Sequence, residues 1–394
     1  MSVAPRRRSI LLATAAVTAA ATAPAAASPT AGHRPHRPSG PLVIGHRGAA
    51  GWRPEHTADA YAYAVRAGAD WIEPDLVPTK DHVLVVRHEN EIGGTTDVAD
   101  HPGFADRRTT KTVDGKAVTG WFTEDFTLRE LKTLRTVERL PLVRDRNTVF
   151  DGRGRVLTFQ EVVDLARRLS RESGRRIAVF PETKHPTYFR SIGLPLEEEL
   201  IRVIRRNRLT ARDCVVQSFE PTSLRRVAAA RLGLPLWQAL GTSGGPYGHG
   251  TAYRDMMTPA GLREIASYAD WIGPDKSSLV PPGTLLADAH AAGLKVGAYT
   301  FRAENQYLPA AYRRGTDPNA FGDAFAEYAF HYGQGVDAVV TDFPDIAAQA
   351  RDDLRGVAGG TTASRPPGAG GGAEGPALTR GGPALTRTPA RPGP

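Results

Sequence analysis

Short apolar runs alternate with helical segments along most of the chain. Eight runs have the length and branched apolar content of buried strands: 42–46, 71–75, 177–182, 214–219, 234–240, 271–275, 295–300 and 337–342. The segments between them include helical patterns at 56–67, 159–169, 196–207, 221–230, 259–268 and 283–292. Because parallel strands need a crossover connection, this order predicts an α/β fold with a parallel sheet. Eight strands between residues 42 and 350 fit a (β/α)8 TIM barrel.

A ninth apolar run, 83–87, does not fit the barrel pattern. Only residues 78–82 separate it from the strand that ends at Asp75, whereas a parallel crossover needs about a dozen residues. We therefore expect an antiparallel hairpin arm that brings His88 back towards Asp75. The polar stretch 90–155 is too long for a plain loop and predicts a small insertion on the catalytic side of the barrel. Thr127–Glu130 and Thr158–Glu161 have the spacing of capping boxes at helix starts.

The first 27 residues have the pattern of an export signal. Arg6-Arg7-Arg8 precedes an uncharged, Ala-rich run that ends in Ala25-Ala26-Ala27, as in a secretory signal peptide. The order Arg7-Arg8-Ser9 resembles the twin-arginine type. The sequence therefore predicts a secreted or cell-envelope protein with no membrane span. It divides into the signal 1–27, a linker 28–40, a barrel 41–355 and a disordered Gly/Pro-rich tail 356–394.

Net charge argues against nucleic acid as a partner. The chain carries +8 overall, but residues 1–40 contribute +5 and residues 356–394 contribute +3, so the barrel region has no net charge. Binding to nucleic acid depends on a basic surface, which the barrel lacks. The basic tail predicts at most a contact with an anionic cell wall. The one cysteine, Cys214, excludes an intramolecular disulfide and has the apolar surroundings of a buried strand residue.

Charged side chains follow three of the predicted strands. Active sites of (β/α)8 barrels lie at the carboxyl ends of the strands. His46 and Arg47 follow the first strand beside two glycines, which suits an anion site because arginine presents a planar fork to phosphate. Glu73 and Asp75 end the second strand and point to the same face, and Glu182 ends the third. Three carboxylates without a thiolate predict a hard cation, calcium or magnesium.

His88 completes a set of groups for phosphodiester hydrolysis. This reaction needs a base for the attacking oxygen and an acid for the departing alkoxide, and two imidazoles can supply both. We expect His46 and His88 to approach one phosphorus from neighbouring strands. For His56, His82, His185 and His290, the local sequences are typical of helix starts, turns and helix surfaces, where a solvated or capping histidine is expected.

An ordered series of motifs resembles the glycerophosphodiester phosphodiesterase family. It consists of His46-Arg47-Gly48-Ala49, Pro54-Glu55-His56-Thr57, Gly68-Ala69-Asp70, Glu73-x-Asp75-Leu76, Thr79-Lys80-Asp81, Val85-Val86-x-His88, Pro181-Glu182-x-Lys184, Gln217-Ser218-Phe219, Tyr268 to Asp275, and Thr341 to Asp345. The similarity covers residues 42–350, and the later motifs are similar to the periplasmic or secreted, calcium-dependent branch. Glu89 stands where the family usually has aspartate, and Thr183 where it usually has an apolar residue.

The resemblance implies a role for each candidate residue. It implies His46 and His88 as the acid–base pair, and Glu73, Asp75 and Glu182 as ligands of Ca²⁺, with Mg²⁺ as the other choice. Arg47 and Lys184 would bind phosphate, and Gln217 and Tyr299 would line the substrate pocket. The implied reaction converts a glycerophosphodiester and water to sn-glycerol 3-phosphate and an alcohol, in glycerol and lipid metabolism. A glycerol hydroxyl would attack first, and water would then open a cyclic phosphate.

Three alternatives stay open at the level of sequence. A related barrel phospholipase or sphingomyelinase D would act on intact lipids and would need an exposed apolar docking surface. Wall teichoic acid, a polymeric glycerophosphodiester, would suit a secreted enzyme. A cell-surface binding protein with an inactive site is the third, although every residue needed for the chemistry is present.

Overall fold

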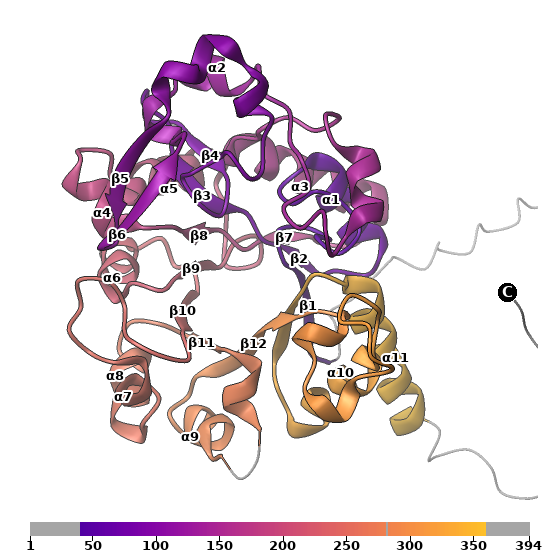
Figure 1. Cartoon of the computed structure of the whole chain (residues 1–394). Coiled ribbons are helices and arrows are strands. Elements are labelled where there is room, and N and C mark those ends of the chain that lie inside the picture. The colour runs from indigo at the N-terminus through magenta and orange to yellow at the C-terminus, as the bar shows by residue number, and fades with distance from the viewer. Residues whose placement is uncertain (1–39, 281–282, 360–394) are drawn as a thin grey trace, which may run out of the picture.

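A closed barrel of parallel strands forms the centre of the protein (Figure 1). The computed structural model describes residues 40–280 and 283–359. The barrel strands are β1 (Leu42–Gly45), β2 (Trp71–Ile72) with β3 (Asp75–Pro78), β7 (Ala178–Val179) with β8 (Glu182–Thr183), β9 (Val216–Ser218), β10 (Leu236–Leu240), β11 (Trp271–Pro274), β12 (Lys295–Phe301) and β13 (Ala338–Thr341). β1 pairs with both β13 and β2, which closes the ring. The predicted (β/α)8 barrel and its strands are confirmed.

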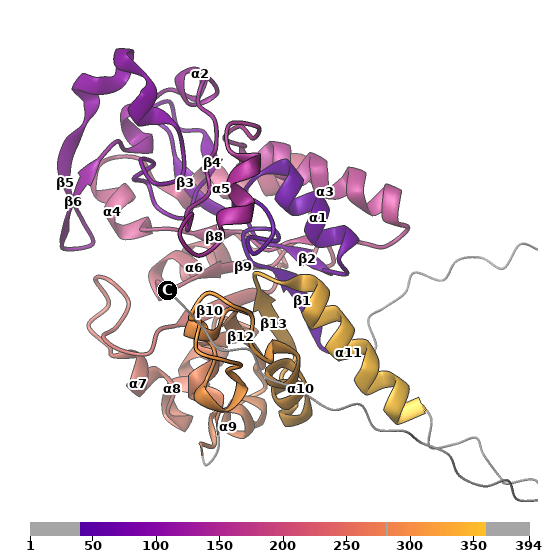
Figure 2. The ribbon, with the colours of Figure 1, turned by 45° about the vertical axis from the view of Figure 1, so that its right-hand side comes forward.

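Helices surround the barrel between successive strands (Figures 1 and 2). They are α1 (Ala58–Arg66), α3 (Phe159–Ser173), α4 (Pro186–Ser191), α5 (Leu196–Asn207), α6 (Pro221–Ala229), α7 (Tyr253–Met256), α8 (Pro259–Ala266), α9 (Leu285–Ala291), α10 (Ala324–Gln334) and α11 (Pro344–Gly359). Both predicted capping boxes are formed, at Thr127 and at Thr158. α11 continues to Gly359, beyond the predicted start of the tail at 356.

Prolines interrupt two neighbouring barrel strands at the point where the acidic residues lie. Pro74 separates β2 from β3, and Pro181 separates β7 from β8. Proline has no backbone N–H and cannot donate to the sheet. Their carbonyls still accept, from the amides of Glu182 and Gln217 respectively, at 3.0 and 2.9 Å. The strands therefore stay in register across the break while the backbone changes direction beside Glu73 and Glu182.

Aromatic side chains fill the interior of the barrel. Trp237 is fully buried, stacks on Trp271 at a centroid separation of 5.0 Å, and meets Phe180 edge-on at 4.7 Å. Gly273 and Gly297, on the next two strands of the barrel, leave room for the indole, since a Cβ at either position would lie within about 2 Å of it. Large rings opposed by glycines thus give the dense packing of a protein interior.

The hairpin and the insertion follow the second barrel strand, as predicted. β4 (Leu84–Val86) pairs antiparallel with β3. The insertion then contains η1 (Val98–Asp100), η2 (Pro102–Arg107), the antiparallel pair β5 (Thr109–Val113) and β6 (Lys116–Gly120), η3 (Thr123–Asp125), α2 (Leu128–Leu131) and η4 (Asp145–Phe150). Both views show α2 at the opposite end of the molecule from α7, α8 and α9.

The ends of the chain carry predictions that the structure leaves open. The signal peptide 1–27 and nearly all of the linker and of the tail lie outside the described residues, so export stays a prediction. Within 40–280 and 283–359, no helix is both long and apolar enough to cross a bilayer. Cys214 is a buried thiol next to β9, as expected.

We expect Gly297→Ala to destabilise the barrel. The new methyl group would lie 1.8 Å from the Trp237 ring, and overpacking of this kind costs about 1–3 kcal/mol. Urea denaturation followed by circular dichroism measures the change. Gly333→Ala is the control, because a Cβ on this exposed glycine of α10 meets nothing within 4 Å and should stabilise by about 0.5 kcal/mol. Equal stabilities for wild type and Gly297→Ala would show that the indole is not tightly packed.

Candidate active site

Three buried carboxylates meet at the carboxyl ends of the second and third barrel strands. Glu73, Asp75 and Glu182 each offer an oxygen, and these atoms lie within 4.8 Å of one another. Asp75 pairs in register with Glu182 across β3 and β8. All three side chains are at most 7% exposed. Strand pairing therefore produces the cluster, because register brings side chains from different parts of the sequence to one level of the barrel.

The electrostatics of this cluster fit a bound cation. Burial and repulsion from Asp75 and Glu182 raise the pKa of Glu73 well above its usual value. Burial also raises the pKa of Glu182 to about 7, against the opposing attraction of Lys184. Asp75 Oδ1 is buried without a hydrogen-bond partner. Carboxylates that repel one another and an oxygen without a donor are what a hard cation satisfies.

His46 lies directly after β1, held by a carboxylate on the opposite side of its ring from the triad. Its Nδ1 is 2.5 Å from Asp342 Oδ1, and its Nε2 is 3.8 Å from Glu73 Oε2. A carboxylate can only accept, so Nδ1 carries the proton and Nε2 the free lone pair. Burial lowers the pKa of His46 to about 4, despite the opposing effect of Asp342. The ring is neutral at pH 7 and presents an acceptor to the site.

His88 has the same arrangement on the hairpin arm. It follows β4, and its Nδ1 is 2.5 Å from Glu89 Oε1. Its Nε2 is therefore also the free lone pair. Burial and the neighbouring cations Arg47 and Lys184 lower the pKa of His88 to about 3. Glutamate at position 89 thus orients the imidazole, so its difference from the expected aspartate does not remove this contact.

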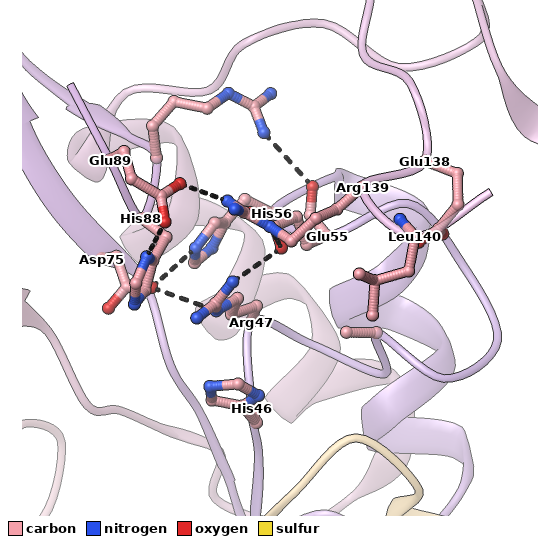
Figure 3. Close-up of polar contacts among 12 residues, drawn as sticks. His46, Arg47, Glu55, His56, Asp75, His88, Glu89, Glu138, Arg139 and Leu140 are labelled. Carbon is pink, nitrogen blue, oxygen red and sulfur yellow. Dashed lines mark hydrogen bonds and ion pairs between the residues drawn. The ribbon is translucent and has the colours of Figure 1, made fainter. Parts of the chain in front are cut away.

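A cavity of about 160 Å³ brings the predicted site together. Eight of the nine predicted residues line it, namely His46, Arg47, Glu73, His88, Glu182, Lys184, Gln217 and Tyr299, and Trp237 also contributes to its wall. The ninth, Asp75, lies beside it in the acidic triad. In Figure 3 the Arg47 guanidinium lies between the imidazoles of His46 and His88. Together with Val340 of β13, these residues bring seven of the eight barrel strands to one small space.

Two cations stand beside the acidic triad. Arg47 donates to Glu55 at 2.8 Å, and its Nε is 3.5 Å from Asp75 Oδ2 without a hydrogen-bond partner. Lys184 donates to Glu182 at 2.6 Å and lies 3.8 Å from Asp75 Oδ1. Both side chains are buried and border the cavity. They can therefore contact an anion placed there.

Gln217 and Tyr299 have partners that sequence alone did not indicate. The Gln217 amide donates to Glu73 Oε1 at 2.6 Å, so it supports a triad member as well as bordering the cavity. Tyr299 donates to the Leu240 carbonyl at 2.8 Å. Thr183, the other departure from the family pattern, is buried and bonds Ser218 at 2.9 Å, so its hydroxyl is satisfied.

The expectation of a solvated or capping role is wrong for His56. Its side chain is fully buried, its Nε2 is 2.9 Å from Asp75 Oδ2, and its Nδ1 is 2.8 Å from the Tyr61 hydroxyl. It orients a triad carboxylate from behind. The left-handed backbone at His56, with φ of 56°, turns the ring inwards just before α1. Its place in the Pro54–Thr57 motif was the signal that could have revealed this role.

The three other histidines considered from the sequence, His82, His185 and His290, lie outside the cavity. His82 is exposed in the hairpin turn, and His290 is paired with Asp337 on an outer helix. His185 precedes α4 and bonds Asp114 at the tip of the β5–β6 hairpin, at 2.6 Å. None of the three contacts the acidic triad.

Sequence reasoning missed the residues that hold the site in place. Glu55 accepts from Arg47, and Asp342 accepts from His46. Two arginines of the insertion, Arg139 and Arg144, bind these same carboxylates. The two arginines could be identified only from their partners in the folded structure, because an arginine in a polar segment has no distinguishing sequence pattern.

Known proteins with similar sequences cover nearly the same part of the chain. Glycerophosphodiester phosphodiesterase GDPD6 of Arabidopsis thaliana is 33% identical over 79% of this chain and 86% of its own length. A glycerophosphodiester phosphodiesterase of Haemophilus influenzae is 26% identical over 78% of this chain and 89% of its own.

Solved structures share the fold. A glycerophosphoryl diester phosphodiesterase from Silicibacter pomeroyi matches with a TM-score of 0.58 and 24% identity, over 82% of this chain and 96% of its own. A phosphodiesterase from Oleispira antarctica, solved in complex with the product sn-glycerol-3-phosphate, matches with a TM-score of 0.52 and 18% identity, over 79% and 96%.

Residues 46–346, which include every residue of the cavity described above, match the Glycerophosphoryl diester phosphodiesterase family. The chain therefore belongs to this family.

Proposed function

We propose that this enzyme converts a glycerophosphodiester and water into sn-glycerol 3-phosphate and an alcohol. One observation carries the proposal: two imidazoles with free Nε2 atoms share a small cavity with an arginine, a lysine and two carboxylates of the buried triad, whose third member, Asp75, lies beside the cavity. Such a site can bind a phosphodiester and move protons on both sides of phosphorus. The names of relatives at 33% and 26% identity support the substrate class.

We propose Ca²⁺ as the metal ion, with Mg²⁺ as the alternative, held by Glu73, Asp75 and Glu182. The donors are all carboxylate oxygens, which hard cations prefer. When bound, the cation supplies positive charge next to the phosphate oxygens and stabilises the charge that develops in the reaction. Lys184 and Arg47 add positive charge on the same side of the cavity.

The two histidines perform the proton transfers of this proposal. The glycerol 2-hydroxyl attacks phosphorus and gives its proton to one imidazole, while the bond from phosphorus to the alcohol oxygen breaks and that oxygen takes a proton from the other imidazole. Water then opens the cyclic phosphate with the two transfers reversed. One ring must be protonated at the start, and the bound phosphodiester anion favours this because a negative charge raises the pKa of a nearby imidazole.

Cavity size favours a deacylated substrate over an intact lipid. About 160 Å³ accommodates a glycerophosphate group, and the free 2-hydroxyl needed for attack is blocked by an acyl chain in a diacyl lipid. Isolated exposed side chains such as Leu142 and Val149 occur in the insertion, but scattered apolar residues are normal on protein surfaces.

Metal removal is expected to abolish turnover of glycerophosphocholine, and added Ca²⁺ is expected to restore it. Without a cation the three buried carboxylates repel, so Ca²⁺ should also raise the melting temperature. Product release measured after chelation and dialysis, and again after Ca²⁺ or Mg²⁺ is returned, tests this. Added Ca²⁺ should raise the melting temperature of Glu73→Gln by less than it raises that of wild type. Full activity after exhaustive metal removal would overturn the proposed metal dependence.

We expect His46→Asn and His88→Asn each to lower kcat by about 10²–10⁴-fold, the usual contribution of general acid–base catalysis. Affinity for sn-glycerol 3-phosphate, measured by calorimetry, should change by only a few fold, because Arg47 and Lys184 remain. His82→Asn is the control: His82 is exposed at φ of 60°, a conformation that asparagine tolerates. Normal kcat in either site variant would remove the paired-histidine mechanism.

Glycerophosphocholine should be hydrolysed more than about 100-fold faster than phosphatidylcholine, because the 2-acyl chain of that lipid removes the intramolecular nucleophile. Initial rates at equal concentrations in mixed micelles give the ratio. Faster turnover of the intact lipid would instead support the phospholipase alternative.

A further inference from the structure

In both imidazoles of the proposed acid–base pair, Nδ1 is hydrogen-bonded to a carboxylate. His46 is bound to Asp342 and His88 to Glu89, each at 2.5 Å. In both pairs the bond uses one carboxylate oxygen and leaves the second oxygen for another donor. Each second oxygen accepts from an arginine of one short piece of the insertion, and the second oxygen of Asp342 also accepts from Arg302.

Arg139 occupies the second oxygen of Glu89. Its NH2 group donates to Glu89 Oε2 at 2.5 Å. The same guanidinium forms a two-pronged contact with Glu55, through Nε at 2.6 Å and NH2 at 2.7 Å. Glu55 in turn accepts from Arg47. Figure 3 shows Arg139 between Glu55 and Glu89, with His88 and Arg47 on the far side of these carboxylates.

Arg144 occupies the second oxygen of Asp342. Its NH2 group donates to Asp342 Oδ2 at 2.6 Å, and its Nε donates to Glu304 Oε1 at 2.7 Å. Its NH1 group donates to the Ala50 carbonyl, in the loop that carries His46 and Arg47, at 2.9 Å. Arg144 is 6% exposed, so this contact is shielded from water and retains much of its electrostatic strength.

The segment that carries both arginines is itself fixed to the barrel. Asn147 donates to the Ala50 carbonyl at 3.2 Å and to Glu138 Oε2 at 2.9 Å. Glu138 also accepts from the Leu140 amide at 2.8 Å. These contacts dock residues 138–147 against the loop after β1.

We propose that Arg139 and Arg144 are positioning residues of the reaction: through Glu89 and Asp342, the insertion fixes the orientation of both catalytic imidazoles. The proposal rests on the function proposed for His46 and His88. According to this proposal, both imidazoles are correctly oriented only when residues 138–147 are docked on the barrel. The barrel supplies the reacting groups, and the insertion determines how they point.

The physical reason lies in what an unanchored carboxylate would do. Holding an imidazole in one tautomer and one orientation is the usual task of the carboxylate behind a catalytic histidine. The Glu89 side chain is 38% exposed, so without Arg139 its rotation into solvent would release His88. Asp342 is buried and keeps a second arginine, Arg302, at 2.9 Å, so loss of Arg144 should loosen His46 less.

A merely structural role for the two arginines makes a different prediction. Arginines that only anchor the insertion would change stability and activity together, without distinguishing one histidine from the other. The proposed role is specific: Arg139 acts on His88, and Arg144 acts on His46.

Histidine NMR tests that specificity independently of turnover. In protein labelled with ¹⁵N at histidine, wild type should show His46 and His88 as Nδ1–H tautomers. Arg139→Ala should give a tautomer mixture at His88 alone, and Arg144→Ala at His46 alone. Arg146→Ala, an exposed neighbour on η4, should leave both signals unchanged. Unchanged tautomers in both arginine variants, or equal changes at both rings, would overturn the proposal.

Kinetics on the metal-loaded enzyme give the second test. Arg139→Ala should lower kcat about 10-fold or more and also raise KM, because Glu55 and Arg47 lose support, whereas Arg144→Ala should lower kcat alone. Added guanidinium should restore part of the rate. Arg139→Lys and Arg144→Lys keep the positive charge and replace the alanine variants if those fold poorly. The kcat of each lysine variant should lie between that of the matching alanine variant and that of wild type.

Double variants separate the proposed path from an independent effect. If Arg139 acts through Glu89, then adding Arg139→Ala to Glu89→Gln should lower kcat by less than about 3-fold more. Multiplied losses would contradict the proposal. If the wild-type enzyme does not hydrolyse glycerophosphodiesters, the proposed function is refuted, and the tautomer measurement alone decides the positioning role. If the wild-type enzyme is active and both arginine variants have normal kcat, only the positioning role is refuted.

Discussion

Repulsion among three buried carboxylates is the constraint around which the rest of the site is arranged. Glu73, Asp75 and Glu182 face one another within 4.8 Å, and in a low-dielectric interior such a group needs compensating charge. Lys184 is directly paired with the triad. Arg47 also approaches it, but Glu55 already takes a large part of its charge. The local balance remains negative, and a divalent cation would correct it.

The same balance explains why the neighbouring residues pair as they do. His56 and Gln217 donate to Asp75 and Glu73, so neutral groups stabilise the acids without cancelling the charge that would attract a cation. Further out, arginines and carboxylates alternate: Arg47, Glu55, Arg139 and Glu89 form one chain of contacts that ends at His88. Glu55, at the centre of this chain, is buried, and a buried ion pair is costly to break. Its pairing therefore holds Arg139 in place beside Glu89, the partner of His88.

The barrel and most of the site could be predicted from the sequence because both follow from local patterns. Short apolar runs indicate strands, strand ends indicate the mouth of the barrel, and residues such as Glu73 and Asp75 are two positions apart on one strand. The anchoring network could not be predicted in this way. Arg144 and Asp342 are 198 residues apart, and Arg139 and Glu55 are 84 apart. Their pairing depends on how the insertion docks, which no short motif specifies. His56 was misjudged for a related reason: a helix-start pattern does not reveal that a left-handed residue turns its ring into the core.

The two histidines need different amounts of support, and the insertion matches that difference. His46 follows a barrel strand, its side chain is 10% exposed, and it is bound to an aspartate that two arginines hold. His88 lies on a hairpin arm, and its side chain is 30% exposed. Its partner is a glutamate, which has one more rotatable bond than aspartate and loses more conformational freedom when ordered. Arg139 is held by its bidentate contact with Glu55, so Glu89 has a partner in a fixed position. The insertion lies outside the barrel, yet its ion pairs affect the active site. They offset the conformational entropy that is lost when His88 and Glu89 are held in one orientation.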